Sequence, residues 1–155
     1  MAVRRASLAA GVAVARITQP YRVAGRRAPA PAPQLDAAWL AVIAAVAKRH
    51  PAGRLFVGGR SSGARVACRT AVAASAAGIV CLAFPLHPPG RPDKSRADEL
   101  LTGRPTLVVN GDRDAFGIPD AGDNIEVVVL PGETHSLNKN PAAVGAAVVA
   151  WLTRA

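Results

Sequence analysis

Large side chains are scarce in this sequence. Aromatic residues make up 4% of the 155 residues and there is one methionine, although 50% of the residues are hydrophobic. Most of these are Ala and Val, so the core has to bring its elements close together rather than fill space with rings. No apolar run approaches the ~20 residues that a membrane helix needs, and we expect no membrane association. Cys68 and Cys81 lie in apolar segments without metal-type spacing, which favours buried reduced thiols in a cytoplasmic protein, with no bound metal.

Acidic residues are nearly absent from the first part of the chain. Up to residue 92 there are 13 Lys and Arg and one acid, Asp36, which gives +12; from Asp93 onward there are six and nine, which gives −3. Such asymmetry indicates either an anionic partner or the lack of a segment with balancing acids. The 16 arginines against three lysines, with so much alanine, are more typical of a GC-rich genome. The basic residues are not interleaved with stacking aromatics and no G-K-[ST] ending occurs, so we expect neither nucleic-acid binding nor a P-loop.

The opening segment, MAVRRASLAAGVAVARITQP, has two arginines followed by a short apolar stretch, as a secretory signal has. The stretch is rich in Ala and Gly rather than Leu, and Arg16 interrupts it before a clear cleavage site. We therefore favour a helix over residues 4–10 that ends at Gly11, followed by a strand over residues 12–17.

Strand and helix patterns alternate along the rest of the chain. Alternating Ala-Pro in residues 21–33 favours a loop, and Pro51-Ala52-Gly53 is expected to end a helix. The expected strands are 12–17, 55–57, 79–84, 106–110 and 125–130; the expected helices are 34–50, 61–77, 96–101 and 141–153, the last with Asn140 as its cap. Short, Val-rich strands between helices are typical of a parallel sheet covered on both faces. We expect one α/β domain over residues 1–155, with ligands at the loops that follow the strands.

One turn between a strand and a helix carries a serine between glycines, in Gly59-Arg60-Ser61-Ser62-Gly63. This is the frame of the G-x-S-x-G motif, in the strand-to-helix context that the motif requires. A serine on such a sharp turn has a strained backbone and an exposed hydroxyl, and the residues two before and two after it must both be very small. The alternative is a glycine-rich connection with an incidental serine. The context favours Ser61 as a nucleophile.

A serine nucleophile needs a base, and the base needs an acid that orients it. Asp112 and Asp114 follow the strand at 106–110, and His135 follows the strand at 125–130, so all of them lie at the same sheet edge as Ser61. The chain order Ser, Asp, His is the order that this fold class uses. His87, in a proline-rich loop after another strand, is the rival base and ranks below His135.

Three segments together resemble a known family. GGRSSGARVA, LVVNGDRDAFG and GETHSL are similar to the serine elbow, acid turn and histidine turn of small α/β-hydrolases. The resemblance points to the dienelactone-hydrolase-related group, which includes the hydrolase-like domain of a chromatin acetyltransferase complex subunit and small bacterial homologues. QPYRVAGRRAPAPAPQLDAAW is also similar to a segment of that group, and the likeness extends from about residue 11 to residue 151. It implies the triad Ser61–Asp114–His135, since the family's acid ends a G-x-x-D turn, with the Ser62 backbone N–H as one oxyanion donor.

The chain departs from this group at its start. Those proteins open with further strands and an H-G-x-G-type loop that supplies a second oxyanion donor, and neither occurs in these 155 residues. We therefore expect an α/β-hydrolase fold that lacks its first strands, as an N-terminally incomplete domain. Three outcomes are open: the flanking strands close up, the first strand moves, or the chain is incomplete. An edge exposed in this way favours self-association.

The resemblance implies a serine hydrolase that cleaves an ester, thioester or related acyl bond of a small molecule and needs no cofactor. The alternative is a catalytically weak or inactive binding module, which the absent oxyanion loop favours. A third interpretation is an anion-binding protein that uses five arginines, which could equally bind a carboxylate or phosphate of a substrate: Arg22, Arg26, Arg27, Arg60 and Arg65. Of these, Arg22, Arg26 and Arg60 are the candidates for substrate binding. The Pro-rich residues 84–92 are expected to form part of a cap over the site.

Overall fold

A parallel sheet forms the middle of the molecule. The structure is a computed structural model that describes residues 2–50 and 53–155. Within these residues the sheet has four strands in the order β1 (Phe56–Arg60), β2 (Gly78–Leu82), β3 (Thr106–Gly111) and β4 (Ile125–Leu130), and every neighbouring pair is parallel. The strands therefore end at one common edge, where the loops that follow them meet. The prediction of a mostly parallel α/β sheet is confirmed.

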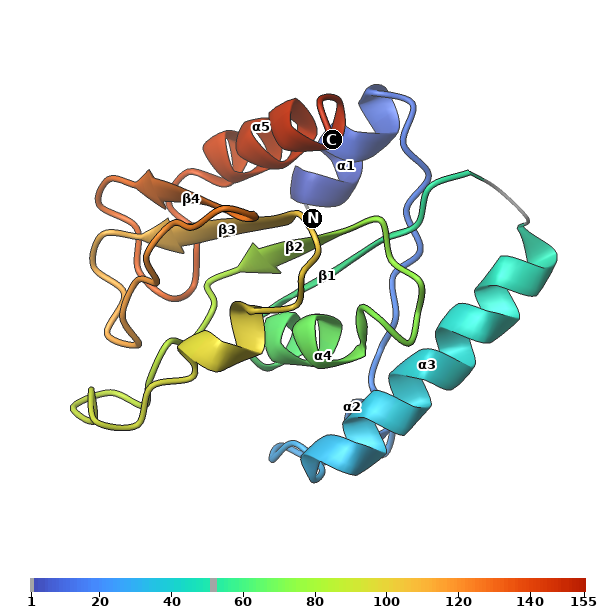
Figure 1. Ribbon diagram of the computed structural model, residues 1–155, viewed down its shortest axis with the longest axis horizontal. Helices are drawn as coiled ribbons and strands as arrows, with labels where there is room; N and C mark the ends of the chain where they lie inside the picture. Colours follow the sequence, from blue (N-terminus) through green and yellow to red (C-terminus); the bar gives the residue numbers. More distant parts are fainter. Residues whose placement is uncertain (1, 51–52) are drawn as a thin grey trace.

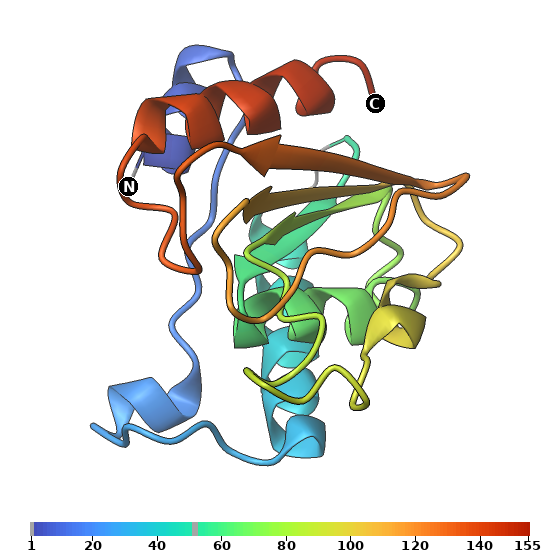
Figure 2. The same ribbon diagram turned by 90° about the vertical axis from the view of Figure 1, so that its left-hand side faces the viewer.

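Helices cover both faces of this sheet (Figures 1 and 2). On one face lie α1 (Ala2–Ala9) and α5 (Pro141–Leu152), which touch where Gly145 is closely approached by Ala6. On the other face lie α4 (Ser62–Thr70) and, outside it, α3 (Ala32–Arg49). Asp36 of α3 accepts two hydrogen bonds from the Arg69 guanidinium of α4, at 2.8 and 2.7 Å. This bidentate pair ties the outer helix to the inner one.

The two hydrophobic cores are built from alternate residues of the same strands. In β2, Ile79 and Cys81 face the core beneath α4, while Val80 faces the core beneath α5. In β3, Val108 faces the first core and Val109 the second. Successive side chains of a strand point to opposite faces, so a strand that is apolar at every position is buried on both sides. This is the physical basis of the continuous Val-rich runs in the sequence.

The expected strand over residues 12–17 was wrong. This segment runs from α1 on one side of the sheet to α2 (Pro20–Val23) on the other, and within the described residues it lies outside the sheet. A strand exists only where a neighbour pairs with its backbone, and β1 pairs on one side with β2 alone among the described strands. Among the described residues the flanking strands do not close up, because residues 12–17 take a course outside the sheet.

Other differences are confined to the ends of elements. Both ends of the expected loop over residues 21–33 are helical: α2 extends to Val23, and α3 begins at Ala32. The helix α4 ends at Thr70 rather than at residue 77, because the chain turns over residues 71–75 and Ser75 takes a left-handed φ of 53°. The short helix is the 3₁₀ turn η1 (Ala97–Leu100).

The start of α5 agrees with the prediction from the sequence. The Asn140 side chain accepts a hydrogen bond from the Ala143 N–H, so the predicted cap of α5 is confirmed. Pro51 and Ala52, which were expected to end the helix α3, lie outside the described residues. None of the helices in the described part of the chain is long and apolar enough to cross a membrane.

Candidate active site

Ser61 lies on a sharp turn between β1, which ends at Arg60, and α4, which begins at Ser62. Its φ of 53° and ψ of −116° are unusual for a residue with a side chain, and such strain is typical of functional turns. The turn is tight because Gly59 passes Gly63 closely: a Cβ on Gly59 would lie 2.6 Å from the Gly63 carbonyl oxygen. The strained backbone expected for this serine is present.

Only one of the two glycines is required by the packing. A Cβ added to Gly63 would meet nothing within 4 Å, whereas one on Gly59 would overlap the backbone of Gly63. The expectation that both flanking positions must be very small therefore holds for Gly59 and is wrong for Gly63. The asymmetry arises because the Cβ of Gly59 would point at the start of α4, while that of Gly63 would point into open space.

The structure brings Ser61, His135 and Asp114 together. His135 Nε2 lies 2.8 Å from Ser61 Oγ, and His135 Nδ1 lies 2.9 and 3.0 Å from the two carboxylate oxygens of Asp114. The Asp114 side chain is fully buried and that of His135 is 25% exposed. Each ring nitrogen thus faces one partner, which is the arrangement that lets an imidazole take a proton from a serine while a carboxylate orients it.

The Asp114 carboxylate is held by further hydrogen bonds. The Phe116 backbone N–H donates to Oδ1 at 2.9 Å, and Asn110 Nδ2 lies 3.4 Å from Oδ2. Asp114 also begins the next turn of the chain, because its carbonyl oxygen accepts a hydrogen bond of 3.1 Å from the Gly117 N–H. Several donors on a buried carboxylate fix its position and compensate for its lost hydration.

Asn110, the last-but-one residue of β3, joins the ends of two strands to the acid turn. Its fully buried side chain accepts a hydrogen bond from the Phe84 N–H at 2.9 Å and donates to the Phe84 and Gly117 carbonyl oxygens at 3.2 and 3.1 Å. The sequence pattern predicted no role for Asn110. The only sign of its structural role was an amide side chain at the end of an otherwise apolar strand.

The turn that carries His135 is positioned by a buried glutamate and a glycine. Glu133 is 1% exposed, and its Oε1 accepts a hydrogen bond from the Asn140 N–H at the start of α5. A Cβ added to Gly111, the last residue of β3, would lie 2.8 Å from the Glu133 Cβ. Only glycine fits at this position. These contacts fix the distance between the acid turn and the histidine turn.

The arginines predicted to bind substrate lie in different surroundings. Arg60 is exposed, and its Nη1 donates a hydrogen bond of 2.9 Å to the Ser136 carbonyl oxygen, next to His135. Arg22 and Arg26 are exposed in and after α2, and the Arg22 guanidinium lies 5.8 Å from the centre of the Tyr21 ring. Among the contacts of the described residues, none joins Arg22 or Arg26 to the triad. Substrate binding by these arginines stays a prediction.

The remaining candidates also have definite places. Ser62 is the first residue of α4, so its backbone N–H has no acceptor within the helix and follows directly after Ser61. His87, the rival base, has its Nδ1 2.9 Å from the Pro88 carbonyl oxygen, and its ring lies against Gly117. The loop at 84–92, expected to be part of a cap, contains no helix and is exposed from Pro89 onward.

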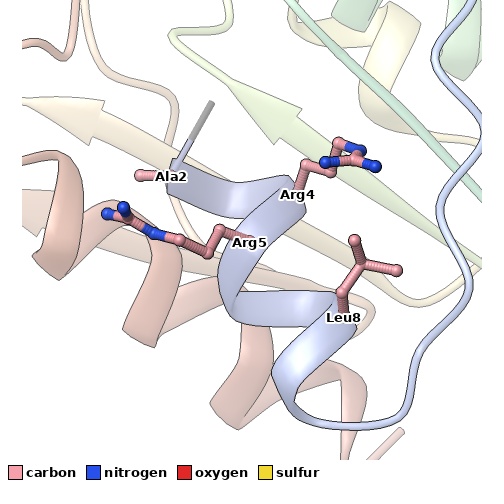
Figure 3. Close-up of a pocket in the computed structure, with 4 residues that line it drawn as sticks. All are labelled: Ala2, Arg4, Arg5 and Leu8. Carbon is pink, nitrogen blue, oxygen red and sulfur yellow. The ribbon is translucent and has the colours of Figure 1, made fainter.

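Two surface hollows lie away from these residues. One, of about 310 Å³, is lined by Ala2, Arg4, Arg5 and Leu8 of α1, and Figure 3 shows Arg4 and Arg5 pointing to opposite sides. The other lies on the outer face of α3. Neither shows the converging polar groups of a ligand site. Within residues 2–50 and 53–155, no three His, Cys, Asp or Glu side chains gather closely enough to hold a metal ion.

A parallel sheet with a serine on a strained strand-to-helix turn, an acid after β3 and a histidine after β4 defines the α/β-hydrolase fold. The sequence model of the alpha/beta hydrolase domain family matches residues 1–145. The chain therefore belongs to this family. Among curated proteins, no sequence matches the chain.

Solved structures show the same fold. XC6422 from Xanthomonas campestris, described as an α/β serine hydrolase without lid, is 20% identical with a TM-score of 0.78 over 99% of this chain and 71% of its own. An α/β serine hydrolase homologue from Coxiella burnetii is 17% identical (TM-score 0.68; 97% of this chain, 74% of that chain). A structure from work on LipS and LipT, two metagenome-derived lipolytic enzymes, is 15% identical (TM-score 0.68; 99% and 88%). At these identities the likeness concerns the fold.

Proposed function

We propose that this protein is a serine hydrolase that cleaves an ester, thioester or related acyl bond of a small molecule. The observation that carries the proposal is the continuous chain of contacts from Ser61 Oγ through the His135 ring to the buried Asp114 carboxylate. These three residues come from three different loops at one sheet edge. Membership of the alpha/beta hydrolase domain family supports the same reaction class.

The proposed mechanism follows the atoms of these contacts. His135 Nε2 accepts the Ser61 hydroxyl proton as Oγ attacks the acyl carbon, and Asp114 stabilises the imidazolium that forms. His135 then returns the proton to the leaving alcohol or thiol, which departs and leaves an acyl-serine. Water, deprotonated by His135, then attacks the acyl carbon of this ester. His135 returns that proton to Ser61 Oγ as the C–Oγ bond breaks, which releases the carboxylic acid and restores the serine hydroxyl.

The negative charge on the former carbonyl oxygen needs hydrogen-bond donors. The Ser62 N–H, at the N-terminus of α4, supplies one donor and the favourable end of a helix dipole. The H-G-x-G-type loop that provides a second donor in similar hydrolases does not occur in these 155 residues. Loss of one such donor typically costs ~100- to 1,000-fold in turnover, so hydrolysis that relies on the Ser62 N–H alone is expected to be slow by that factor.

Labelling with a fluorophosphonate tests the proposal without knowledge of the substrate. The parent chain, Ser61→Ala and Ser62→Ala would each be treated and their intact masses measured, with circular dichroism to verify folding. We expect one adduct on the parent and on Ser62→Ala, which keeps its backbone N–H, and none on Ser61→Ala. An adduct that persists on Ser61→Ala would exclude this serine as the nucleophile.

The binding-module alternative predicts a different result. This alternative is favoured by our assignment of one oxyanion donor, the Ser62 N–H, among the described residues beside Ser61. A folded parent that gains no adduct would support a module that uses the hydrolase scaffold to hold a partner. Anion binding through Arg22, Arg26 and Arg60 would instead weaken steeply with salt, which a titration with inorganic phosphate at two ionic strengths would show.

We also propose a narrower family, a cellular compartment and self-association for this protein. The segments GGRSSGARVA and LVVNGDRDAFG support a relationship to the dienelactone-hydrolase-related group. The free thiols of Cys68 and Cys81, which share a hydrogen bond of 3.4 Å, support a reducing compartment such as the cytoplasm. Among the described strands, β1 pairs with β2 alone, so its other edge can pair with a strand of a second molecule. This edge supports self-association, which sedimentation velocity over a range of concentrations would measure.

A further inference from the structure

We infer that Phe116 is a positioning residue of this site, whose ring holds the His135 imidazole in its reactive orientation and stabilises the imidazolium. This inference rests on the proposed function, and it gives a role to Phe116, which has no part in the mechanism proposed above. The two rings are stacked, with centroids 4.1 Å apart and planes inclined by 30°. Phe116 is half-buried, so its ring covers one face of a histidine that is otherwise partly open to solvent.

The hydrogen bonds of His135 leave one motion of its ring uncontrolled. The imidazole is held at Nδ1 by Asp114 and at Nε2 by Ser61, on opposite sides of the ring. Two such contacts fix the line that joins them, but they do not prevent the ring from tilting about that line. An aromatic face packed against the ring opposes this tilt. Stacking therefore supplies the constraint that the two hydrogen bonds lack.

The Phe116 ring can act in this way because its own backbone is held at both ends. Its N–H donates to Asp114 Oδ1 at 2.9 Å, and its carbonyl oxygen accepts a hydrogen bond of 2.9 Å from the His87 N–H. These partners belong to the acid turn and to the loop after β2. The same residue thus fixes the acid through its backbone and the base through its side chain.

The stack also acts on the charge that forms during the reaction. When His135 takes the serine proton it becomes a cation, and a cation over the face of an aromatic ring is attracted by the ring's negative π-surface. The interaction is stronger for the imidazolium than for neutral imidazole. It therefore favours the charged state that precedes the acyl-serine more than the resting state, which is the condition for a faster chemical step.

Three variants separate this role from a general contribution to folding. Phe116→Leu keeps the backbone hydrogen bonds and apolar bulk but loses the aromatic face, and Phe116→Tyr restores that face. Phe56→Leu is the matched control, because Phe56 packs edge-on against Trp151, with centroids 5.7 Å apart, at the opposite end of β1 from Ser61. The rate constant for fluorophosphonate labelling would be measured for each folded variant.

We expect labelling of Phe116→Leu to be about 10-fold slower than that of the parent, on the scale of one aromatic contact. Phe116→Tyr should regain the parent rate, and Phe56→Leu should label at the parent rate even where it lowers the melting temperature. Labelling of Phe116→Leu at the parent rate would overturn the inference. So would an equal loss in Phe116→Leu and Phe116→Tyr, since the aromatic face would then not matter.

Nuclear magnetic resonance gives an independent readout of the stack. The ring protons of His135, identified by their loss in His135→Gln, should be displaced by the Phe116 ring current relative to the urea-unfolded chain. The displacement should vanish in Phe116→Leu. If that variant does not fold, an undisplaced resonance in the parent still refutes the stack. A folded parent that is not labelled at all would refute the proposed function, and the role of Phe116 would fall with it.

Discussion

The two glycines around Ser61 should respond in opposite ways to the addition of one methyl group. A Cβ on Gly59 would lie 2.6 Å from the Gly63 carbonyl oxygen, whereas ordinary van der Waals contact begins at 3.4 Å. The turn must open by more than 3.4 − 2.6 = 0.8 Å, because the Gly63 carbonyl carbon would lie closer still to the added Cβ. The atoms that would have to move are backbone atoms of β1 and of the first turn of α4, and Ser61 lies between them.

These distances set the expected magnitudes for Gly59→Ala. Forcing a methyl group into a close-packed contact costs about 1–3 kcal/mol of unfolding free energy. A displacement of the nucleophile by about 1 Å costs roughly 100-fold in rate. Gly63→Ala meets no atom within 4 Å and occupies a helical position, so it should keep the parent rate and gain up to about 0.5 kcal/mol.

Urea unfolding and fluorophosphonate labelling would measure both effects on the same proteins. A Gly59→Ala protein with the stability and labelling rate of the parent would refute a steric requirement for glycine at this position. A loss of both in Gly63→Ala would equally contradict this explanation, since the requirement for glycine would then come from the motif as a whole and not from the contact of Gly59 with α4.

Three further changes test other parts of the structure. Asp114→Asn should fold but label ~10,000-fold more slowly, because an amide favours the wrong histidine tautomer; near-normal labelling would exclude Asp114 as the orienting acid. Asn110→Ala leaves the buried Phe84 N–H without its acceptor, while the Phe84 carbonyl keeps its hydrogen bond from the Leu86 N–H. The free energy of unfolding in urea should fall by about 2 kcal/mol, against a loss below about 0.5 kcal/mol for substitution of an exposed residue. The hydrogen bond with Cys68, together with burial, raises the pKa of Cys81 well above its usual value of 9.0. Its folded-state proton is therefore retained while the unfolded thiol ionises, so stability should fall as the pH rises above about 9, and Cys81→Ala should remove that part of the fall.

Much of the fold could be predicted because it depends on local pattern. A strand buried on both faces must be mostly apolar, so β2 and β3 were visible as short Val- and Leu-rich runs. The half-buried strand β4 was visible by its run of three valines, although it carries Glu126. The position of α5 followed from Asn140 and Pro141, a capping side chain and a residue suited to the first helical turn. The serine turn was visible because glycine next to a strand end is an unusual local feature.

The strand expected at residues 12–17 shows where local pattern is insufficient. Its sequence, VAVARI, has the residues of a strand, but a strand is completed by hydrogen bonds to a neighbour, and the neighbour is chosen by the tertiary structure. The same holds for the end of α4, where the chain turns at Ser75 although the residues around it are good helix formers.

The candidate site divides in the same way. The sequence by itself determined which residue types follow each strand, and therefore that a serine, an acid and a histidine would share one sheet edge. Only the tertiary structure decided that His135, 74 residues after Ser61 in the chain, lies 2.8 Å from it, and that Phe116 stacks on its ring. It also decided that Asn110 joins two strand ends. Contacts between residues so far apart depend on how the sheet and its loops pack, because no hydrophobic period or turn preference within a single segment specifies them.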